Sequence, residues 1–230
     1  MTAAAARPVD DFGSDLKRAI AVWAKQPLLP IISVLWWTLP VDVSGNDTLV
    51  LALGVVVILF LGWPGTEREW YRRAFAGKQL APSEIWPNTR RFFGRFVRLG
   101  LLVSPVAILV IALSLWPEGT PLVKTGLVLA IVFLLDVALT FVTPALAFTT
   151  ASARSALSIG LTMLRAYWPT AAPYALTPAL VVIFGTQTLF EPITGPGGAL
   201  VATALAGLLA LALKGATVAF YLRHTPALAT

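Results

Sequence analysis

The amino-acid sequence predicts an all-α, polytopic membrane protein with six transmembrane helices. Of its 230 residues, 57% are hydrophobic and only 12% are charged, whereas about 25% of the residues of an average soluble domain are charged. The mean hydropathy is +0.81. A helix needs about 20 apolar residues to cross a bilayer, and the charges of this chain fall between six apolar stretches that approach or exceed this length.

The predicted spans follow from these stretches in chain order. We expect a single transmembrane domain over residues 14–224, with a disordered cytoplasmic tail at residues 1–13, which are polar and small, and a second tail at 225–230. The fourth and sixth stretches are each interrupted by one charge, Asp136 and Lys214 respectively. The expected spans cover residues 27–41, 48–64, 99–117, 122–148, 169–190 and 198–222.

The distribution of basic residues predicts the orientation of these spans. With an inner N-terminus, all but Lys124 of the seventeen Lys and Arg residues lie on inner segments, as cytoplasmic connections prefer. We therefore expect both termini in the cytoplasm and a multi-pass location in the bacterial inner membrane. A basic balance is also typical of nucleic-acid binding, but the topology already accounts for these charges, so no nucleic-acid partner is expected.

Amphipathic helices are expected on the inner face before the spans. The first covers residues 14–26, with Ser14 as its N-cap, and turns into the first span at Pro27. In the long inner connection, Thr66 and Glu69 have the spacing of a capping box. After Pro87, residues 88–100 interleave Phe with Arg and lead into the third span.

A further amphipathic helix is expected over residues 153–167, capped by Thr150 or Ser152. The chain thus repeats one order three times: an inner amphipathic helix, a span outward, a short turn and a span inward. Units of this kind begin near Asp15, Asn88 and Ser155. Because each hairpin enters from the same side, we predict three parallel hairpin repeats rather than inverted ones.

Two sets of residues are candidates for contact with the bilayer. Basic side chains among apolar ones attract anionic lipid headgroups, although the same residues would also serve topology and anchoring alone. Tryptophan prefers the level of the headgroups. The predicted headgroup ligands are Arg90, Arg91, Arg95, Arg98, Lys17 and Arg18, and the predicted interface anchors are Trp23, Trp36, Trp37, Trp63, Trp116 and Trp168.

The run PALAFTTASARSALSIGLTMLRAYW, residues 144–168, resembles a stretch of bacterial integral membrane proteins related to the membrane domain of glycerophosphodiester phosphodiesterases. The segment at residues 77–100 is similar to the matching part of the earlier unit. The resemblance implies a six-helix membrane module. It carries no catalytic residues, because the phosphodiesterase activity of such proteins belongs to a separate soluble domain.

The charges within the spans are the candidate functional residues. Asp136 and Lys214 lie fifteen and sixteen residues into inward-running spans, so at 1.5 Å per residue both reach roughly the same depth. We predict that they pair inside the bundle. The alternatives are that Lys214 extends to the inner interface and that Asp136 is a structural acid bonded to Thr140 or Thr143.

The residue inventory excludes several kinds of site. The chain has no cysteine and one histidine, His224, so iron–sulfur clusters, Cys/His zinc sites and thiol nucleophiles are excluded. No phosphate-binding loop and no nucleophile elbow occurs. We predict no catalytic residues, no metal and no cofactor.

These observations favour a non-enzymatic inner-membrane protein, an interaction or accessory component of a lipid- or envelope-related process. The alternative is a transporter or permease-like subunit in which Asp136 couples substrate or proton movement. A membrane-embedded lipid enzyme has the least support. Small residues recur on one face of the sixth span, at Gly198, Ala202, Ala206 and Ala210, which suits packing within the chain, onto a protein partner or in a homo-oligomer.

Overall fold

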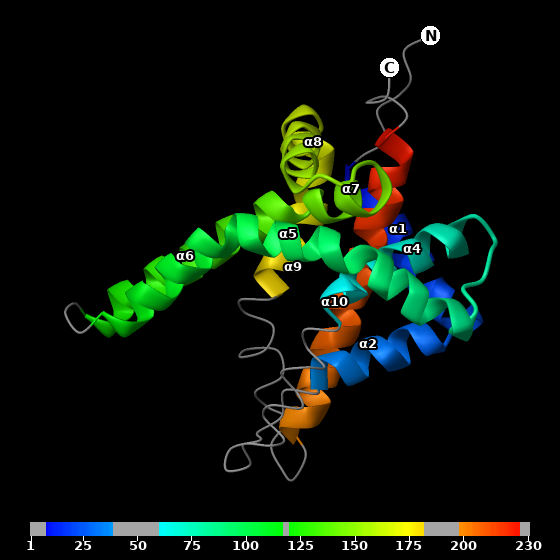
Figure 1. Ribbon diagram of the computed structural model, residues 1–230, viewed down its shortest axis with the longest axis horizontal. Coiled ribbons are helices and arrows are strands. Elements are labelled where there is room, and N and C mark those ends of the chain that lie inside the picture. The colour runs from blue at the N-terminus through cyan, green and yellow to red at the C-terminus, as the bar shows by residue number, and fades with distance from the viewer. Residues whose placement is uncertain (1–7, 39–59, 117–119, 182–197, 226–230) are drawn as a thin grey trace.

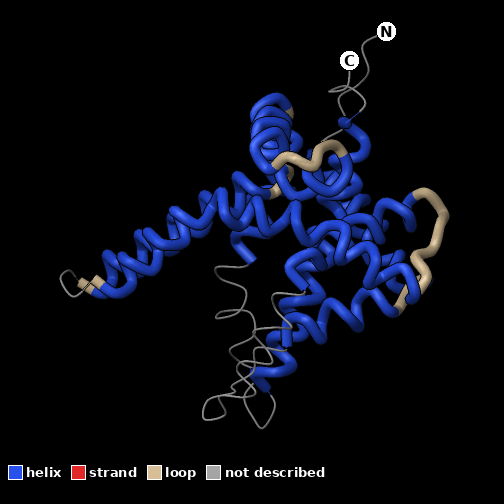
Figure 2. Tube along the Cα trace, viewed as in Figure 1, coloured by secondary structure: helices blue, strands red, loops and turns tan. Residues whose placement is uncertain are grey.

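The computed structural model confirms the helical class of the chain. It describes residues 8–38, 60–116, 120–181 and 198–225, and every regular element in those ranges is a helix (Figures 1 and 2). In chain order these are α1 (Pro8–Lys25), α2 (Leu28–Thr38), the 3-10 helix η1 (Phe60–Gly62), α4 (Trp63–Phe75), α5 (Pro82–Leu115), α6 (Pro121–Leu139), α7 (Val142–Phe148), α8 (Ala153–Ala166), α9 (Trp168–Leu180) and α10 (Gly198–His224).

Several helices are long and apolar enough to cross a membrane. The described part of the chain has three such stretches, Pro82–Leu115, Leu122–Phe148 and Leu200–His224. A fourth candidate is formed by α1 and α2 together, which are bent by 99° at their break. Of the other expected spans, α2 and α9 provide 11 and 13 residues. The remainder of 27–41 and 169–190, and most of 48–64, lie outside the described residues.

The N-terminal helix begins earlier than the sequence predicts. α1 starts at Pro8, so residues 8–13 are helical rather than part of a disordered tail, and Ser14 lies inside the helix instead of capping it. Proline suits the first helical turn, where its missing N–H costs nothing, and Asp10 and Asp11 favour the same end of the helix. The expected turn at Pro27 is confirmed by the bend between α1 and α2.

The inner connection folds differently from its prediction in two places. α4 begins at Trp63, so Thr66 does not cap it; the Thr66 hydroxyl is buried and hydrogen-bonded to that of Thr89 at 2.9 Å. α5 runs for 34 residues without stopping at Pro87. Because Pro87 lies near the start of α5, it costs the helix one backbone hydrogen bond and does not end it.

Later elements agree more closely with their predictions. Ser152 caps α8 and accepts a hydrogen bond from the backbone N–H of Ser155. The fourth expected span is a single apolar stretch that breaks after Leu139 into α6 and the short α7. α10 begins at Gly198, as expected for the last span.

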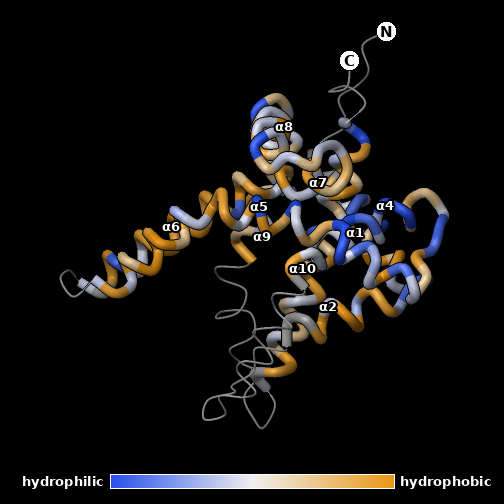
Figure 3. Tube along the Cα trace, viewed as in Figure 1, coloured by the Kyte–Doolittle hydropathy of each residue, from blue (hydrophilic) through white to orange (hydrophobic). Residues whose placement is uncertain are grey.

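The helices are arranged around one junction (Figure 1). α5 and α6 lie side by side and project away from the junction, while α2 and α10 run together in another direction. The projecting parts are mostly hydrophobic, whereas the hydrophilic segments lie on α1, α4 and α8 around the junction (Figure 3). Charged residues therefore concentrate where the apolar helices meet.

One ion pair joins the two ends of the described chain. Arg223 Nη2, near the end of α10, lies 2.5 Å from Asp15 Oδ2 of α1. Tyr174 of α9 donates its hydroxyl to the same carboxylate oxygen at 2.6 Å. Asp15 is only 2% exposed, so this carboxylate fixes α1 against α9 and α10.

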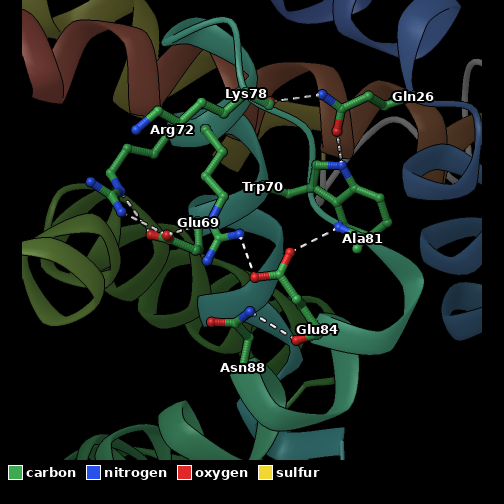
Figure 4. Close-up of polar contacts among 9 residues, drawn as sticks. Gln26, Glu69, Trp70, Arg72, Lys78, Ala81, Glu84 and Asn88 are labelled. Atoms are coloured by element: carbon green, nitrogen blue, oxygen red, sulfur yellow. Dashed lines mark hydrogen bonds and ion pairs between the residues drawn. The ribbon is translucent and has the colours of Figure 1, made fainter.

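Polar contacts join α4 to α5 and to Gln26, between α1 and α2, at the junction (Figure 4). Glu69 accepts hydrogen bonds from Arg72 and Arg73, and Arg73 also donates to Glu84 at 2.8 Å. Burial alone would raise the pKa of Glu69, but the hydrogen bonds from Arg72 and Arg73 and their charges bring the pKa below its usual range. The indole N–H of the buried Trp70 donates to Gln26.

Candidate functional site

Glu67 of α4 is the centre of a buried polar cluster. Its side chain is 1% exposed, and its Oε2 lies 2.9 Å from Nζ of Lys214 in α10. Its other oxygen accepts hydrogen bonds from the hydroxyl of Ser33 in α2 and from the indole N–H of Trp63, both at 2.9 Å. Donors from α2, α4 and α10 therefore converge on this one carboxylate.

The next residue, Arg68, is buried beside this cluster. It is 8% exposed. Its guanidinium donates to the backbone carbonyl of Pro64 at 2.6 Å and to the hydroxyl of Thr143 in α7 at 2.5 Å. Burial lowers the pKa of Arg68 to about 10, although the negative charges of Glu67 and Asp136 oppose this shift. The side chain stays charged at neutral pH.

Arg68 and Lys214 open onto a cavity of about 260 Å³. Asp136 of α6 lines the same cavity and interacts electrostatically with both cations. The wall is completed by hydroxyl and apolar side chains from four helices and the α6–α7 connection. The lining residues are Arg68, Asp136, Leu139, Thr140, Thr143, Pro178, Ala210, Lys214 and Thr217.

The structure thus brings Asp136 and Lys214 to one cavity, where they interact electrostatically. It also places the Lys214 ammonium in an ion pair with Glu67, a carboxylate that the sequence did not predict as its partner. Lys214 points to this buried acid rather than extending away along the helix. Thr140 donates its hydroxyl to the backbone carbonyl of Asp136 at 3.0 Å, and Thr143 accepts from Arg68, so neither contact is the expected bond to the Asp136 carboxylate.

Sequence reasoning missed Glu67 and Arg68 as site residues. Glu67 has the sequence position of an acid at a helix N-terminus, and Arg68 that of one more inner basic residue. The sequence signal that could have identified them is their context, because Glu67, Arg68 and Glu69 form a run of charges between two large aromatic residues, Trp63 and Trp70. Both tryptophans are 1% exposed, and the three charged residues between them are buried as well.

This burial also corrects the role predicted for Trp63, which is a core residue and not an interface anchor. Trp116 and Trp168 are 50% and 44% exposed, so both remain available to headgroups. Trp23 is partly buried and donates its indole N–H to the hydroxyl of Tyr71 at 2.9 Å. Trp36 and Trp37 both lie in the last turn of α2, but the structure does not describe their side chains.

The predicted headgroup ligands are mostly exposed. Arg90, Arg91 and Arg98 are exposed on α5, and Lys17 is exposed on α1. Arg95 is partly buried and donates to the carbonyl of Leu146 at 3.1 Å. The exposed Arg18 lies 4.5 Å from the ring centre of Phe75 and donates to its backbone carbonyl.

The cavity lining combines charged, hydroxyl and apolar side chains. It presents two cations, a carboxylate and three hydroxyl groups within an otherwise apolar wall, which is the usual composition of a small-molecule site. In the described ranges no group of three or more His, Asp or Glu side chains could hold a metal ion.

Comparisons with known proteins add no assignment. Protein-family models, curated proteins and solved structures were each compared with the chain, and none of them matches it.

Proposed function

We propose that this chain is an integral membrane protein that binds a small polar or amphipathic solute in the cavity between α4, α6 and α10, as a permease-like protein does. The observation that carries the proposal is the cavity itself, because Asp136, Arg68 and Lys214 converge on it together with three threonine hydroxyls. Charged groups placed among apolar membrane helices are costly, and they commonly mark a functional site.

With this function we propose a location in the bacterial inner membrane. The proposed topology has six spans in three parallel hairpins, with both termini in the cytoplasm. Its support is the distribution of charge, because the hydrophilic segments of α1, α4 and α8 surround the junction while the projecting helices are apolar (Figure 3). The exposed basic residues Arg90, Arg91, Arg98 and Lys17 would then face anionic headgroups, at about 1 kcal/mol each.

The proposal is tested by access of water to the cavity. The chain has no cysteine, so Thr140→Cys and Ala210→Cys each introduce a single thiol into the cavity wall. We expect both to react with a membrane-impermeant thiol reagent added to membranes. Ala175→Cys is the control, because Ala175 is fully buried on α9 and does not line the cavity. If the cavity thiols react no faster than this control, the cavity is dry and the proposal fails.

An accessory role is the second candidate, and the surface of the α5–α6 pair favours it. Leu101, Ile108, Leu122 and Leu134 are 64–84% exposed, and exposed apolar side chains of this kind contact either lipid or another protein. The mass of the protein purified in detergent distinguishes these cases: a mass above that of one 24.5 kDa chain plus detergent would support assembly, and a monomer would count against it.

A further inference from the structure

The cavity contains a buried positive charge, Arg68, that no carboxylate of the described residues contacts directly. In the parts of the chain that the structure describes, no Asp or Glu oxygen lies within 4.0 Å of the Arg68 guanidinium. Its hydrogen-bond acceptors are two uncharged oxygens, those of Pro64 and Thr143. A charge removed from water is normally paired directly with an opposite charge. Arg68 is therefore arranged to receive negative charge from outside the chain.

The second cation of the cavity, Lys214, differs from Arg68 because it contacts a carboxylate directly. Lys214 is already paired with Glu67, whereas the two hydrogen bonds of Arg68 use two of the five N–H groups that a guanidinium carries. The planar guanidinium fits the two oxygens of a carboxylate or phosphate group. The chemistry of the cavity thus favours an oxoanion as the ligand of Arg68.

Asp136 sets the charge balance of such a complex. The charges that act on it are those of Arg68 from α4 and Lys214 from α10, and Glu67 acts through its contact with Lys214. The residues that α7 and α9 contribute to the wall, Thr143 and Pro178, are uncharged. Two cations are thus balanced by two carboxylates, and an added anion would leave one negative charge in excess. A proton on Asp136 removes that excess.

We infer that the cavity binds a small carboxylate- or phosphate-bearing solute on Arg68 and that Asp136 takes up one proton as the anion binds. This inference rests on the proposed function, because it identifies the ligand class of the same cavity. The anion and the proton add no net charge, so a permease built this way would move both together.

The test uses the full chain purified in detergent, with acetate and inorganic phosphate as probes. The unfolding temperature is measured against probe concentration at constant ionic strength set with sodium chloride. We expect a saturable rise. For acetate, the apparent affinity should fall by up to about tenfold for each unit of increase from pH 6 to pH 8, the limit for one proton bound per anion.

Two variants separate a binding role from a structural one. Arg68→Gln should weaken binding of the probes at least tenfold, whereas Arg165→Gln, which removes an exposed guanidinium of α8 outside the cavity, should leave the affinity unchanged. Asp136→Asn removes the opposing charge, so it should bind acetate more tightly at pH 8 and lose the pH dependence. A gain of affinity cannot come from misfolding, so this variant remains decisive if Arg68→Gln does not fold.

Other outcomes overturn the inference. Stabilisation by tetramethylammonium but by neither anion would assign the cavity to cations, and an unchanged affinity in Asp136→Asn would exclude the proton. Reaction of the thiol in Thr140→Cys without any effect of the anions would refute the ligand class while the proposed cavity stands; a dry cavity would refute the proposed function itself.

A short-chain phosphatidic acid that saturates at lower concentration than inorganic phosphate would identify the source of the phosphate group as a lipid headgroup.

Discussion

At the scale of single residues, Glu67 shows how one carboxylate can hold three helices. Its oxygens accept from Ser33 of α2, from Trp63 of its own helix and from Lys214 of α10. Glutamate provides enough acceptor sites for all three donors. Removing the carboxylate leaves each donor buried without its acceptor, so the loss exceeds that of a single hydrogen bond.

The first prediction concerns this ion pair. Glu67→Ala should lower the free energy of unfolding by about 3 kcal/mol, because breaking a buried pair leaves its partner charge uncompensated. The double variant Glu67→Leu with Lys214→Met should recover much of this loss, since neither charge remains. Chemical denaturation in detergent measures both. Lys17→Met, at an exposed position of α1, is the control, and a double variant no better than Glu67→Ala would contradict the pairing.

The second prediction concerns pH. The pKa of Glu69 is held below its usual value by Arg72 and Arg73, against the effect of burial. A carboxylate with a depressed pKa stabilises the fold above its unfolded pKa of about 4.3, and this contribution disappears as the pH falls through the folded pKa. The unfolding temperature should therefore decrease as the pH is lowered below about 4.3. In Glu69→Gln this decrease should be less steep. Parallel pH profiles of the two proteins would disprove this role.

At the scale of the elements, close packing of α10 depends on the absence of a side chain at Gly215. A Cβ atom there would lie 2.6 Å from the Cβ of Ala19 in α1 and from Cε1 of Tyr71 in α4. Atoms cannot approach so closely, and both neighbours belong to helices whose other contacts fix their positions. Small residues permit such approach between membrane helices.

The third prediction follows from this approach. Gly215→Ala should destabilise the protein by about 1–3 kcal/mol, as overpacking does in other cores. Gly126→Ala is a matched control in α6, where nothing lies within 4 Å of the added Cβ. Because alanine favours a helix over glycine by about 1 kcal/mol, the control should be neutral or stabilising. Equal effects of the two substitutions on unfolding would refute the packing argument.

At the scale of the whole molecule, the charge distribution implies a sidedness that labelling can test. Lys17→Cys on α1 and Ser155→Cys on α8 are exposed positions that we place on the cytoplasmic side. Thr120→Cys, exposed before α6, belongs to the opposite side. An impermeant thiol reagent added to intact cells should label Thr120→Cys alone, and it should label the other two variants after lysis. Labelling of Lys17→Cys in intact cells would reverse the topology.

Composition alone determined that this chain is helical and belongs in a membrane, because few charges and long apolar stretches leave helices as the way to satisfy the backbone. Local chemistry also narrowed the cap of α8 to Thr150 or Ser152 and determined the turn at Pro27, since both depend on residues adjacent in sequence; the structure then identified Ser152 as the cap. Asp136 and Lys214 could be placed at similar depth from helix geometry, and the structure brings them to one cavity.

Tertiary structure decided what those charges contact. Nothing in the sequence near Lys214 indicates that its partner is Glu67, 147 residues away, and a run of charges after an apolar stretch is typical of a solvated helix end. The packing of α4 against α5, α7 and α10 buries Glu67 and Arg68. The reason is physical: periodicity reports which residues share a helix face, but the burial and pairing of a charge depend on which other helices cover that face.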